Sequence, residues 1–196
     1  SKWSGTRALF GLKTGMNEAF IIDRATRTSL IRAHAGAAHI LKPILFGRDV
    51  RRYRIEQAGR FVIYCHPERT IDDYPSVRDY LLPRRKQLEQ RAAKQRWYEL
   101  QQPAVALLPR LDSPKIVYPI IASQCRFAID RSGYLINDKL FVLPTDDASL
   151  LGLLNSRVAN FYFSAVCAAL EGAGDKYLEF RAQYVDPFPV PAGLAV

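Results

Sequence analysis

The stretch that decides the fold is LKPILFGRDVRRYRI, residues Leu41–Ile55. Within it, Pro43 and Gly47 delimit the apolar run Ile44–Phe46, which predicts a short buried element ending in a glycine-dependent turn. Four arginines follow within seven residues, and Asp49 is the one acid among them. A guanidinium is always charged and offers a planar fork of donors that fits a phosphate group or the edge of guanine. The stretch therefore predicts either a turn that presents arginines to a polyanion or a solvated basic turn with Asp49 paired to one of them.

The composition is that of a globular protein whose excess of basic residues favours an anionic partner. The 196 residues are 48% hydrophobic and 24% charged, enough for one good-sized core or two small ones. The formal net charge of +9 favours nucleic acid as a partner, with an anionic membrane surface as the next candidate. No apolar run approaches the roughly 18 to 20 residues of a membrane helix, and the N-terminus has no signal-peptide pattern. We therefore expect a cytoplasmic protein without a membrane segment, and the abrupt start suggests a piece of a longer polypeptide.

The cysteines and histidines predict no metal site. Cys65, Cys125 and Cys167 form no C-x-x-C pair, so we expect them to be reduced and buried as small hydrophobic residues. His34 and His39 are five residues apart, whereas a zinc pair on a helix is usually spaced by three or four.

The motifs of known catalysts are missing from these residues. There is no glycine-containing cofactor turn, no Asn/Asp-Pro-Pro-aromatic loop, no Walker loop and no Gly-x-Ser-x-Gly elbow. Asp112-Ser113-Pro114-Lys115 echoes a magnesium-dependent nuclease only crudely, because proline stands where the second acid is needed. We therefore expect no catalytic residue, no bound cofactor and no small-molecule ligand, and keep a cryptic nuclease as the weaker alternative.

Hydrophobic periodicity and turn residues predict an α+β fold, a mixed α/β domain with a β-rich block and long packing helices. In the first part of the chain, strands are expected at Ala8–Leu12, Ala19–Asp23 and Arg60–Cys65. Helices are expected at Ala25–His39 and from Asp72 onward, and Pro83 either kinks the second of these or begins another helix. The basic residues between Arg84 and Arg96 are scattered around a helix, which is typical of a solvated surface.

The second part of the chain carries the β-rich block. Its strands are expected at Lys115–Ile121, Arg126–Asp130 and Tyr134–Leu143. Asp130–Gly133 predicts a hairpin turn between the last two strands, and Pro119 indicates an edge strand or a bulge. Asp146 and Asp147 are expected to cap one long amphipathic helix that runs to about Leu170. An extended proline-rich tail follows, with Pro187 to Pro191 at its centre.

Taken in order, these landmarks resemble the TaqI-like C-terminal specificity domain of adenine-specific DNA methyltransferases and type IIG restriction-modification enzymes. The segments that carry the resemblance are Gly11–Phe20, Lys42–Tyr53, Tyr74–Leu81, Leu88–Arg91, Trp97–Leu100, Pro114–Ile116, Leu154–Ser156 and Pro187–Pro191. The Thr-Gly-x-Asn and Gly-Arg-Asp blocks are the most specific of these.

The resemblance implies one target-recognition domain spanning residues 1–196, a fragment of a larger restriction-modification or phage-defence enzyme. It would contact double-stranded DNA in the major groove, while a covalently linked methyltransferase domain rotates the target adenine out of the helix. S-adenosylmethionine would be the cofactor of that linked domain. The chain itself would not be an enzyme, and in the cell it would be associated with the nucleoid when bound.

The residues expected to contact DNA fall into several groups. Lys42, Arg51, Arg52 and Arg54 would neutralise phosphates, so that affinity falls with salt. Gln124, Arg126 and Arg131 have the donors and acceptors that pair with adenine or guanine edges. Thr14 and Asn17 would contact the backbone or support the cleft near the rotated base. Lys115 also counts among the expected contacts, as does Arg48, for which an internal ion pair with Asp49 is the favoured alternative.

A second hypothesis is that the region docks a partner subunit. Trp3, Trp97 and the proline-rich tail are the features that would serve such an interface.

Overall fold

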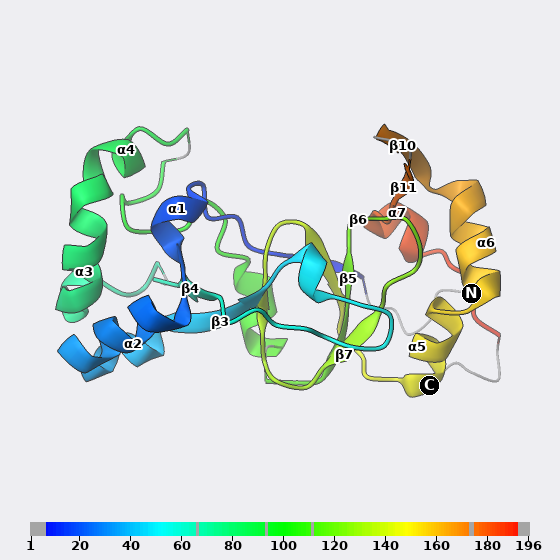
Figure 1. Ribbon diagram of the computed structural model, residues 1–196, viewed down its shortest axis with the longest axis horizontal. Coiled ribbons are helices and arrows are strands. Elements are labelled where there is room, and N and C mark those ends of the chain that lie inside the picture. The colour runs from blue at the N-terminus through cyan, green and yellow to red at the C-terminus, as the bar shows by residue number, and fades with distance from the viewer. Residues whose placement is uncertain (1–6, 66, 93, 111, 173–174, 192–196) are drawn as a thin grey trace. The chain divides into compact units, whose positions relative to one another are not determined.

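The computed structural model describes residues 7–65, 67–92, 94–110, 112–172 and 175–191 (Figure 1). Its strands are β1 (Leu9–Phe10), β2 (Ile21–Ile22), β3 (Leu41–Leu45), β4 (Phe61–Ile63), β5 (Lys115–Pro119), β6 (Ile121–Ala122), β7 (Ala128–Asp130), β8 (Leu135–Ile136), β9 (Leu140–Leu143), β10 (Ala168–Gly172) and β11 (Asp175–Glu179). Its α-helices are α1 (Asn17–Phe20), α2 (Arg24–Ala33), α3 (Pro75–Leu81), α4 (Arg85–Glu89), α5 (Ala148–Leu154), α6 (Arg157–Val166) and α7 (Ala182–Val185). Short 3-10 helices are η1 (Ala35–His39), η2 (Gly47–Asp49), η3 (Ile71–Asp73), η4 (Leu82–Arg84) and η5 (Val105–Arg110). The expected α+β class is confirmed.

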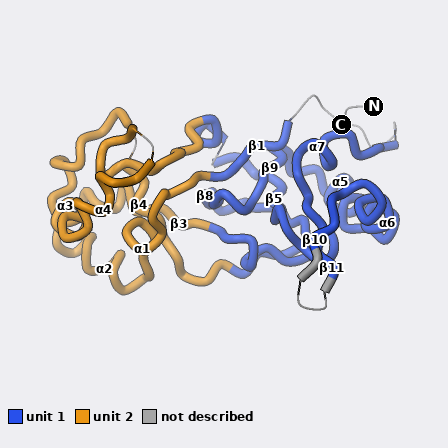
Figure 2. The backbone as a smooth tube through the Cα atoms, turned by 90° about the horizontal axis from the view of Figure 1, so that it is seen from above, with its two compact units in different colours: residues 1–11, 45–56, 106–196 blue, residues 12–44, 57–105 orange. Residues whose placement is uncertain are grey.

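The chain contains two compact units, shown in different colours in Figure 2. Unit 1 comprises residues 1–11, 45–56 and 106–196, and unit 2 comprises residues 12–44 and 57–105. The arginine-rich stretch therefore leaves unit 2 along β3 and delivers its arginines to unit 1. That the whole chain acts as one recognition domain stays a prediction.

Unit 2 is built on the antiparallel strands β2, β4 and β3, with helices α2 and α3 packed together beside them. The Asp23 carboxylate begins α2 by accepting a hydrogen bond from the Thr26 amide at 2.8 Å. The Ser76 hydroxyl of α3 donates to the Leu30 carbonyl of α2 at 3.0 Å. Pro75 occupies the first turn of α3, as its missing amide proton favours.

Arg91 has a structural role in unit 2 instead of the solvated one predicted for it. Its guanidinium donates to the carbonyl oxygens of Leu88, Thr14 and Trp97, each at 2.9 Å. The same group lies over the Phe20 ring at 5.2 Å, and burial lowers the pKa of Arg91. The planar fork of donors on one guanidinium thus joins three backbone segments at once.

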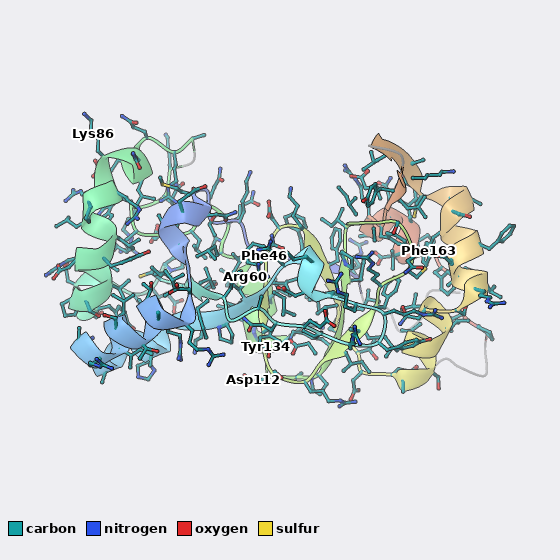
Figure 3. The ribbon with its side chains drawn as sticks, viewed as in Figure 1. Phe46, Arg60, Lys86, Asp112, Tyr134 and Phe163 are labelled. Carbon is teal, nitrogen blue, oxygen red and sulfur yellow. The ribbon has the colours of Figure 1, made fainter. Side chains whose placement is uncertain are left out.

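Unit 1 contains a four-stranded antiparallel sheet of order β1-β9-β5-β7 and a three-stranded sheet of order β10-β11-β6. Its core lies between the strands and helices α5 to α7. Phe163 of α6, labelled in Figure 3, is fully buried there. Its ring is stacked on that of Phe188, with centroids 5.1 Å apart, and lies edge-on to that of Phe180, with centroids 5.4 Å apart. The proline-rich tail is thus partly docked, because Phe188 and Val190 both belong to this core.

The expected long helix from Asp146 to Leu170 is wrong. The chain forms α5, breaks at Asn155, begins α6 after Ser156, and enters β10 at Ala168. The break has a local cause, since the Ser156 hydroxyl accepts a hydrogen bond from the Ala159 amide at 3.0 Å and so starts a new helix. The break cannot be predicted from hydrophobic periodicity, because the apolar residues keep a helical spacing on both sides of it.

Several smaller expectations also need correction. Tyr134–Leu143 is not one strand, because β8 and β9 belong to different sheets, and the helix expected at Ala25–His39 ends at Ala33, where η1 follows. Ala19–Asp23 is not one strand, because helix α1 occupies Asn17–Phe20 and β2 only Ile21–Ile22. Asp130–Gly133 does not join a paired hairpin, because β7 pairs with β5 and not with β8. Pro119 marks no edge, since β5 lies between β9 and β7, and it ends the strand where its missing donor costs nothing.

Candidate nucleic-acid interface

The arginine-rich stretch begins with a turn that its single acid holds in shape. Asp49 is buried, its carboxylate accepts a hydrogen bond from the Phe46 amide at 2.8 Å, and its carbonyl accepts one from the Glu56 amide at 2.7 Å. The favoured ion pair with Arg48 does not form: Arg48 is exposed, and its side chain makes no hydrogen bond or ion pair to any described residue. Asp49 thus stabilises the turn through the backbone and leaves Arg48 to solvent.

The remaining arginines lie on a tight turn between Val50 and Ile55, which face each other in an isolated β-bridge. The Arg51 amide donates to the Arg54 carbonyl at 2.9 Å. Tyr53 has φ of 69°, a left-handed conformation that a non-glycine residue adopts only at a cost. Its amide donates to the Phe127 carbonyl at 2.9 Å, which ties the turn to the β-rich block.

The arginines of this turn differ in their partners. Glu56 accepts from Arg51 at 3.1 Å and from Arg54 at 2.7 Å, and the hydrogen bond from Arg51 is the main reason why the pKa of Glu56 is lowered. Arg52 has no acidic partner among the described residues and donates instead to the carbonyl of Asn155 at 2.7 Å. Its guanidinium also lies 5.3 Å from the centre of the Tyr53 ring. Arg52 is therefore fixed in place without losing its charge.

Asn155, at the break between α5 and α6, organises the neighbouring loop. Its buried side chain accepts a hydrogen bond through Oδ1 from the backbone N–H of Phe127 at 3.1 Å, and its Nδ2 donates one to the backbone carbonyl of Phe127 at 2.9 Å. One turn into α6, Asn160 accepts from the Cys125 amide at 3.0 Å. These bonds fix the loop that carries Gln124 against the start of α6, so that an exposed side chain is presented from a rigid backbone.

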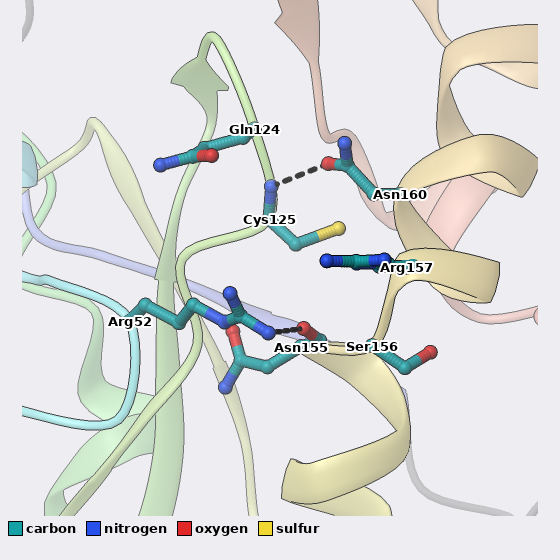
Figure 4. Close-up of a pocket in the computed structure, with 7 residues that line it drawn as sticks. All are labelled: Arg52, Gln124, Cys125, Asn155, Ser156, Arg157 and Asn160. Carbon is teal, nitrogen blue, oxygen red and sulfur yellow. Dashed lines mark hydrogen bonds between the residues drawn. The ribbon is translucent and has the colours of Figure 1, made fainter.

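These segments enclose a pocket of about 250 Å³ in unit 1. It is lined by Arg52, Gln124, Cys125, Asn155, Ser156, Arg157 and Asn160. Figure 4 shows Arg52 and Arg157 reaching into it from two sides, one from the arginine-rich turn and the other from the first turn of α6. Three parts of the sequence, each more than 25 residues from the next, thus line the pocket with the guanidinium groups of Arg52 and Arg157 and the side-chain amide of Gln124.

The pocket carries positive charge without a compensating acid. None of its lining residues is acidic, and burial raises the pKa of the Cys125 thiol to about 12, so this group stays neutral. Within the described part of the chain, no group of three or more His, Cys, Asp and Glu side chains is placed to hold a metal ion.

Lys115 does not fit its expected role as a DNA contact. Its ammonium group is 2.6 Å from the Asp130 carboxylate, and the two side chains are 1% and 0% exposed. Asp130 also accepts hydrogen bonds from the amides of Ser132 and Tyr134. Lys115 is therefore a core residue, and it is equally unavailable to the nuclease site that Asp112 would require.

The other expected residues are placed in several regions. Thr14 is buried in unit 2, where its hydroxyl donates to the exposed Asn17 at 2.7 Å, and Lys42 is exposed on β3 of the same unit. In unit 1, Arg131 is exposed and pairs with Asp146 at 3.2 Å. Arg126 is partly buried and does not line the pocket. The structure thus brings together Arg52 and Gln124 from the expected set.

Arg157 and Asn160 are not among the residues expected from the sequence, because both fall inside the single long helix predicted for this region. The signal that identifies them is Asn155-Ser156, two residues typical of a helix start. With a helix beginning there, Arg157 occupies the exposed first turn.

The features behind the partner-docking hypothesis gain little from the structure. Trp3 lies outside the described residues. Trp97 is partly buried, with the Arg85 guanidinium 5.4 Å from the centre of its ring. Phe188 and Val190 of the tail are engaged in the core of unit 1.

The model of one protein family, the TaqI-like C-terminal specificity domain, matches residues 42–190. The chain belongs to this family. The match includes the arginine-rich stretch, the Gln124 loop and the start of α6, so the pocket lies wholly within the specificity domain. It confirms the resemblance found in the sequence.

The specificity domain also resembles a solved structure of the type IIL restriction-modification enzyme MmeI in complex with DNA. The TM-score is 0.63 at 11% sequence identity, and the likeness covers 90% of this chain but 24% of that one. At this identity it shows the fold alone, and the specificity domain spans about a quarter of the MmeI chain. No curated protein matches the chain. None of the helices in the described ranges is long and apolar enough to cross a bilayer.

Proposed function

We propose that this specificity domain binds double-stranded DNA and recognises the target sequence of a restriction-modification enzyme. The observation that carries the proposal is the convergence of Arg52, Gln124 and Arg157 on one pocket that has no acidic lining residue. Such a surface attracts the phosphate backbone, and an amide on a fixed loop beside it is suited to pairing with a base edge. Family membership and the fold shared with a DNA-bound enzyme support the same conclusion.

The residues expected to contact DNA divide into two classes. Arg48, Arg51, Arg54 and Lys42 supply charge to phosphates, although Glu56 already offsets part of the charge of Arg51 and Arg54. Gln124, Arg126 and Arg131 are the candidates for base edges, where a good bidentate pair is worth about 1–3 kcal/mol of discrimination. Thr14 and Asn17 support the surface of unit 2 through their mutual hydrogen bond.

In the whole polypeptide, the specificity domain would position DNA for a linked methyltransferase domain. That domain would bind S-adenosylmethionine, rotate an adenine out of the duplex and methylate it, in the manner of base-flipping enzymes. The parent enzyme would be a type IIG or phage-defence methyltransferase of the cytoplasm. The specificity domain would itself contribute no catalytic residue.

The test is duplex-DNA binding by the chain across a salt titration. A pool of random duplexes is incubated with the protein, and the bound fraction is recovered and sequenced. We expect log affinity to fall linearly with log salt, with a slope of about −0.9 for each phosphate contact, and a short motif to be enriched.

Three other outcomes would restrict, overturn or replace the proposed function. A steep salt slope without enrichment would limit the proposal to backbone binding and assign sequence selection to the linked domain. Failure to bind duplex at low salt would overturn the proposal. Magnesium-dependent cleavage abolished by Asp112→Asn would replace it with the nuclease alternative.

A further inference from the structure

The polar groups that line the pocket are almost all donors. The side-chain amide of Asn155 is already hydrogen-bonded to the Phe127 backbone. The side-chain oxygen of Asn160 already accepts from the Cys125 backbone amide, so the Asn160 side chain can offer only its NH₂ group, as a donor. The Ser156 oxygen accepts from the Ala159 amide, and its proton remains free to donate. Among the lining side chains, Gln124 keeps a free carbonyl oxygen.

The two arginines reinforce this one-sided chemistry. Arg52 gives one NH₂ group to the Asn155 carbonyl and keeps its other donors, while Arg157 has no side-chain partner among the described residues. A guanidinium never accepts a hydrogen bond and never loses its charge at ordinary pH. The start of α6 adds the positive end of a helix dipole. Two like charges around one small space repel each other unless an anion joins them.

A base edge fits this lining poorly. The major-groove edge of guanine offers two acceptors, which one guanidinium can bind, but it carries no negative charge to hold a second guanidinium beside the first. The edge of adenine also presents an amino group, which needs an acceptor. A phosphodiester group has acceptors only and carries one negative charge. It is also small enough for a space of about 250 Å³, which falls below the size usual for drug-like ligands.

We propose that the Arg52–Arg157 pocket holds one phosphodiester group of the DNA backbone and so sets the position of the Gln124 loop on the duplex. This inference rests on the proposed function and deepens it. The backbone carbonyl of Asn155 binds Arg52, and the side chain of Asn155 holds the loop that carries Gln124. One residue therefore positions both the arginine that would contact the phosphate and the glutamine that would contact a base. The anchored phosphate would thus determine which base pair Gln124 reaches.

Arg157→Gln tests the proposal, with Arg32→Gln as the matched control. Both residues are exposed arginines without a side-chain partner among the described residues, but Arg32 lies on α2 of unit 2, outside the pocket. Neither change should alter the melting temperature appreciably. We expect Arg157→Gln to reduce the salt slope by about 0.9 and to weaken binding about five- to tenfold at 0.1 M salt, equally for all sequences. Arg32→Gln should change neither quantity.

The second arm uses duplexes with single methylphosphonate linkages, which remove one backbone charge at a time. On an enriched duplex, one linkage should weaken binding of the unmodified protein and have no further effect on Arg157→Gln. If Arg157→Gln instead alters base preference at one position and leaves the salt slope unchanged, the pocket reads a base and the proposal is overturned. If Arg157→Gln and Arg32→Gln lose the same amount of DNA affinity, the loss reflects net charge alone and the proposal is overturned. Binding by the unmodified protein with no change in Arg157→Gln would refute the phosphate pocket and leave the proposed function intact.

Discussion

At the scale of single residues, position in the fold decides what a charged side chain does. Lys115 and Arg131 are both basic residues of the β-rich block, and both were expected to meet DNA. Lys115 is buried against Asp130, whereas Arg131 remains 61% exposed while paired with Asp146. Sequence alone does not separate these cases, because both residues stand at the ends of expected strands.

Lys115→Met should therefore be strongly destabilising. It leaves the Asp130 carboxylate buried without its cation, and breaking a buried pair in this way costs about 3–5 kcal/mol. Urea unfolding measures the loss. Arg131→Ala is the control, since it breaks an exposed pair and should cost about 0–1 kcal/mol. A loss of under about 1 kcal/mol for Lys115→Met would contradict the assigned core role.

The buried thiols predict a loss of stability in alkali. Burial raises the pKa of Cys125 to about 12 and those of Cys65 and Cys167 to about 11. In the unfolded chain a thiol titrates at about 8.5, so above that pH the unfolded chain holds fewer protons than the folded one. The free energy of unfolding should accordingly fall as pH rises from about 8 to about 10.

Urea unfolding at the two pH values gives this difference directly. Many other groups titrate in the same range, so the comparison is with a variant in which all three cysteines are alanine. That variant should lose less stability than the natural sequence between the two pH values. Equal losses would mean that the thiols play no part.

At the scale of elements, the break between α5 and α6 creates the candidate site. Asn155 ends one helix, Ser156 begins the next, and Arg157 becomes exposed in the first turn. The break also frees the Asn155 side chain to bind the Phe127 backbone, which a residue inside a continuous helix would be less well placed to do. One uninterrupted helix would have left neither the pocket nor the fixed loop.

Asn155→Ala should impair both stability and DNA binding. It leaves the buried backbone groups of Phe127 without their partner, at about 1–3 kcal/mol for each unsatisfied group, and it loosens the Gln124 loop. Asp147→Ala is the control, because it removes only the N-cap of α5, which accepts from Ser149 and Leu150. That change should cost about 1 kcal/mol and leave DNA affinity unchanged. Binding and urea unfolding are measured on both variants, and equal DNA affinities would contradict the positioning role of Asn155.

At the scale of the whole molecule, net charge would govern the proposed encounter with DNA. The excess of basic residues gives a formal charge of +9, and few acids offset the exposed arginines of the arginine-rich stretch. Such a distribution steers a polyanion over long distances, but only while salt does not screen it.

We expect the association rate constant for duplex DNA to fall several-fold between about 50 and 200 mM salt. Stopped-flow fluorescence with a labelled duplex measures this rate. Arg32→Gln and Arg157→Gln should leave this rate almost unchanged, because each removes one charge from a net charge of +9, whereas only Arg157→Gln should raise the dissociation rate. An association rate independent of salt would show that steering does not operate.

The family, the α+β class and the basic character of the surface were predictable from the sequence. These depend on local signals: the arginine-rich stretch, the buried strand around Val62 and the order of the short motifs. Buried thiols were likewise predictable, because small apolar side chains without pairing partners partition to the interior.

The exposure of each charged residue and its contacts with other charged residues could not be predicted from the sequence, because both depend on the packing of the whole chain. The pairing of Lys115 with Asp130, the use of Arg91 inside unit 2 and the meeting of Arg52 with Arg157 all join residues distant in the chain or hidden by burial. Hydrophobic periodicity indicates which face of a helix or strand is buried, but not which other elements that face contacts. A charge run therefore looks the same in sequence whether it lies in solvent, in a core or around a pocket, and burial and long-range contacts make the difference.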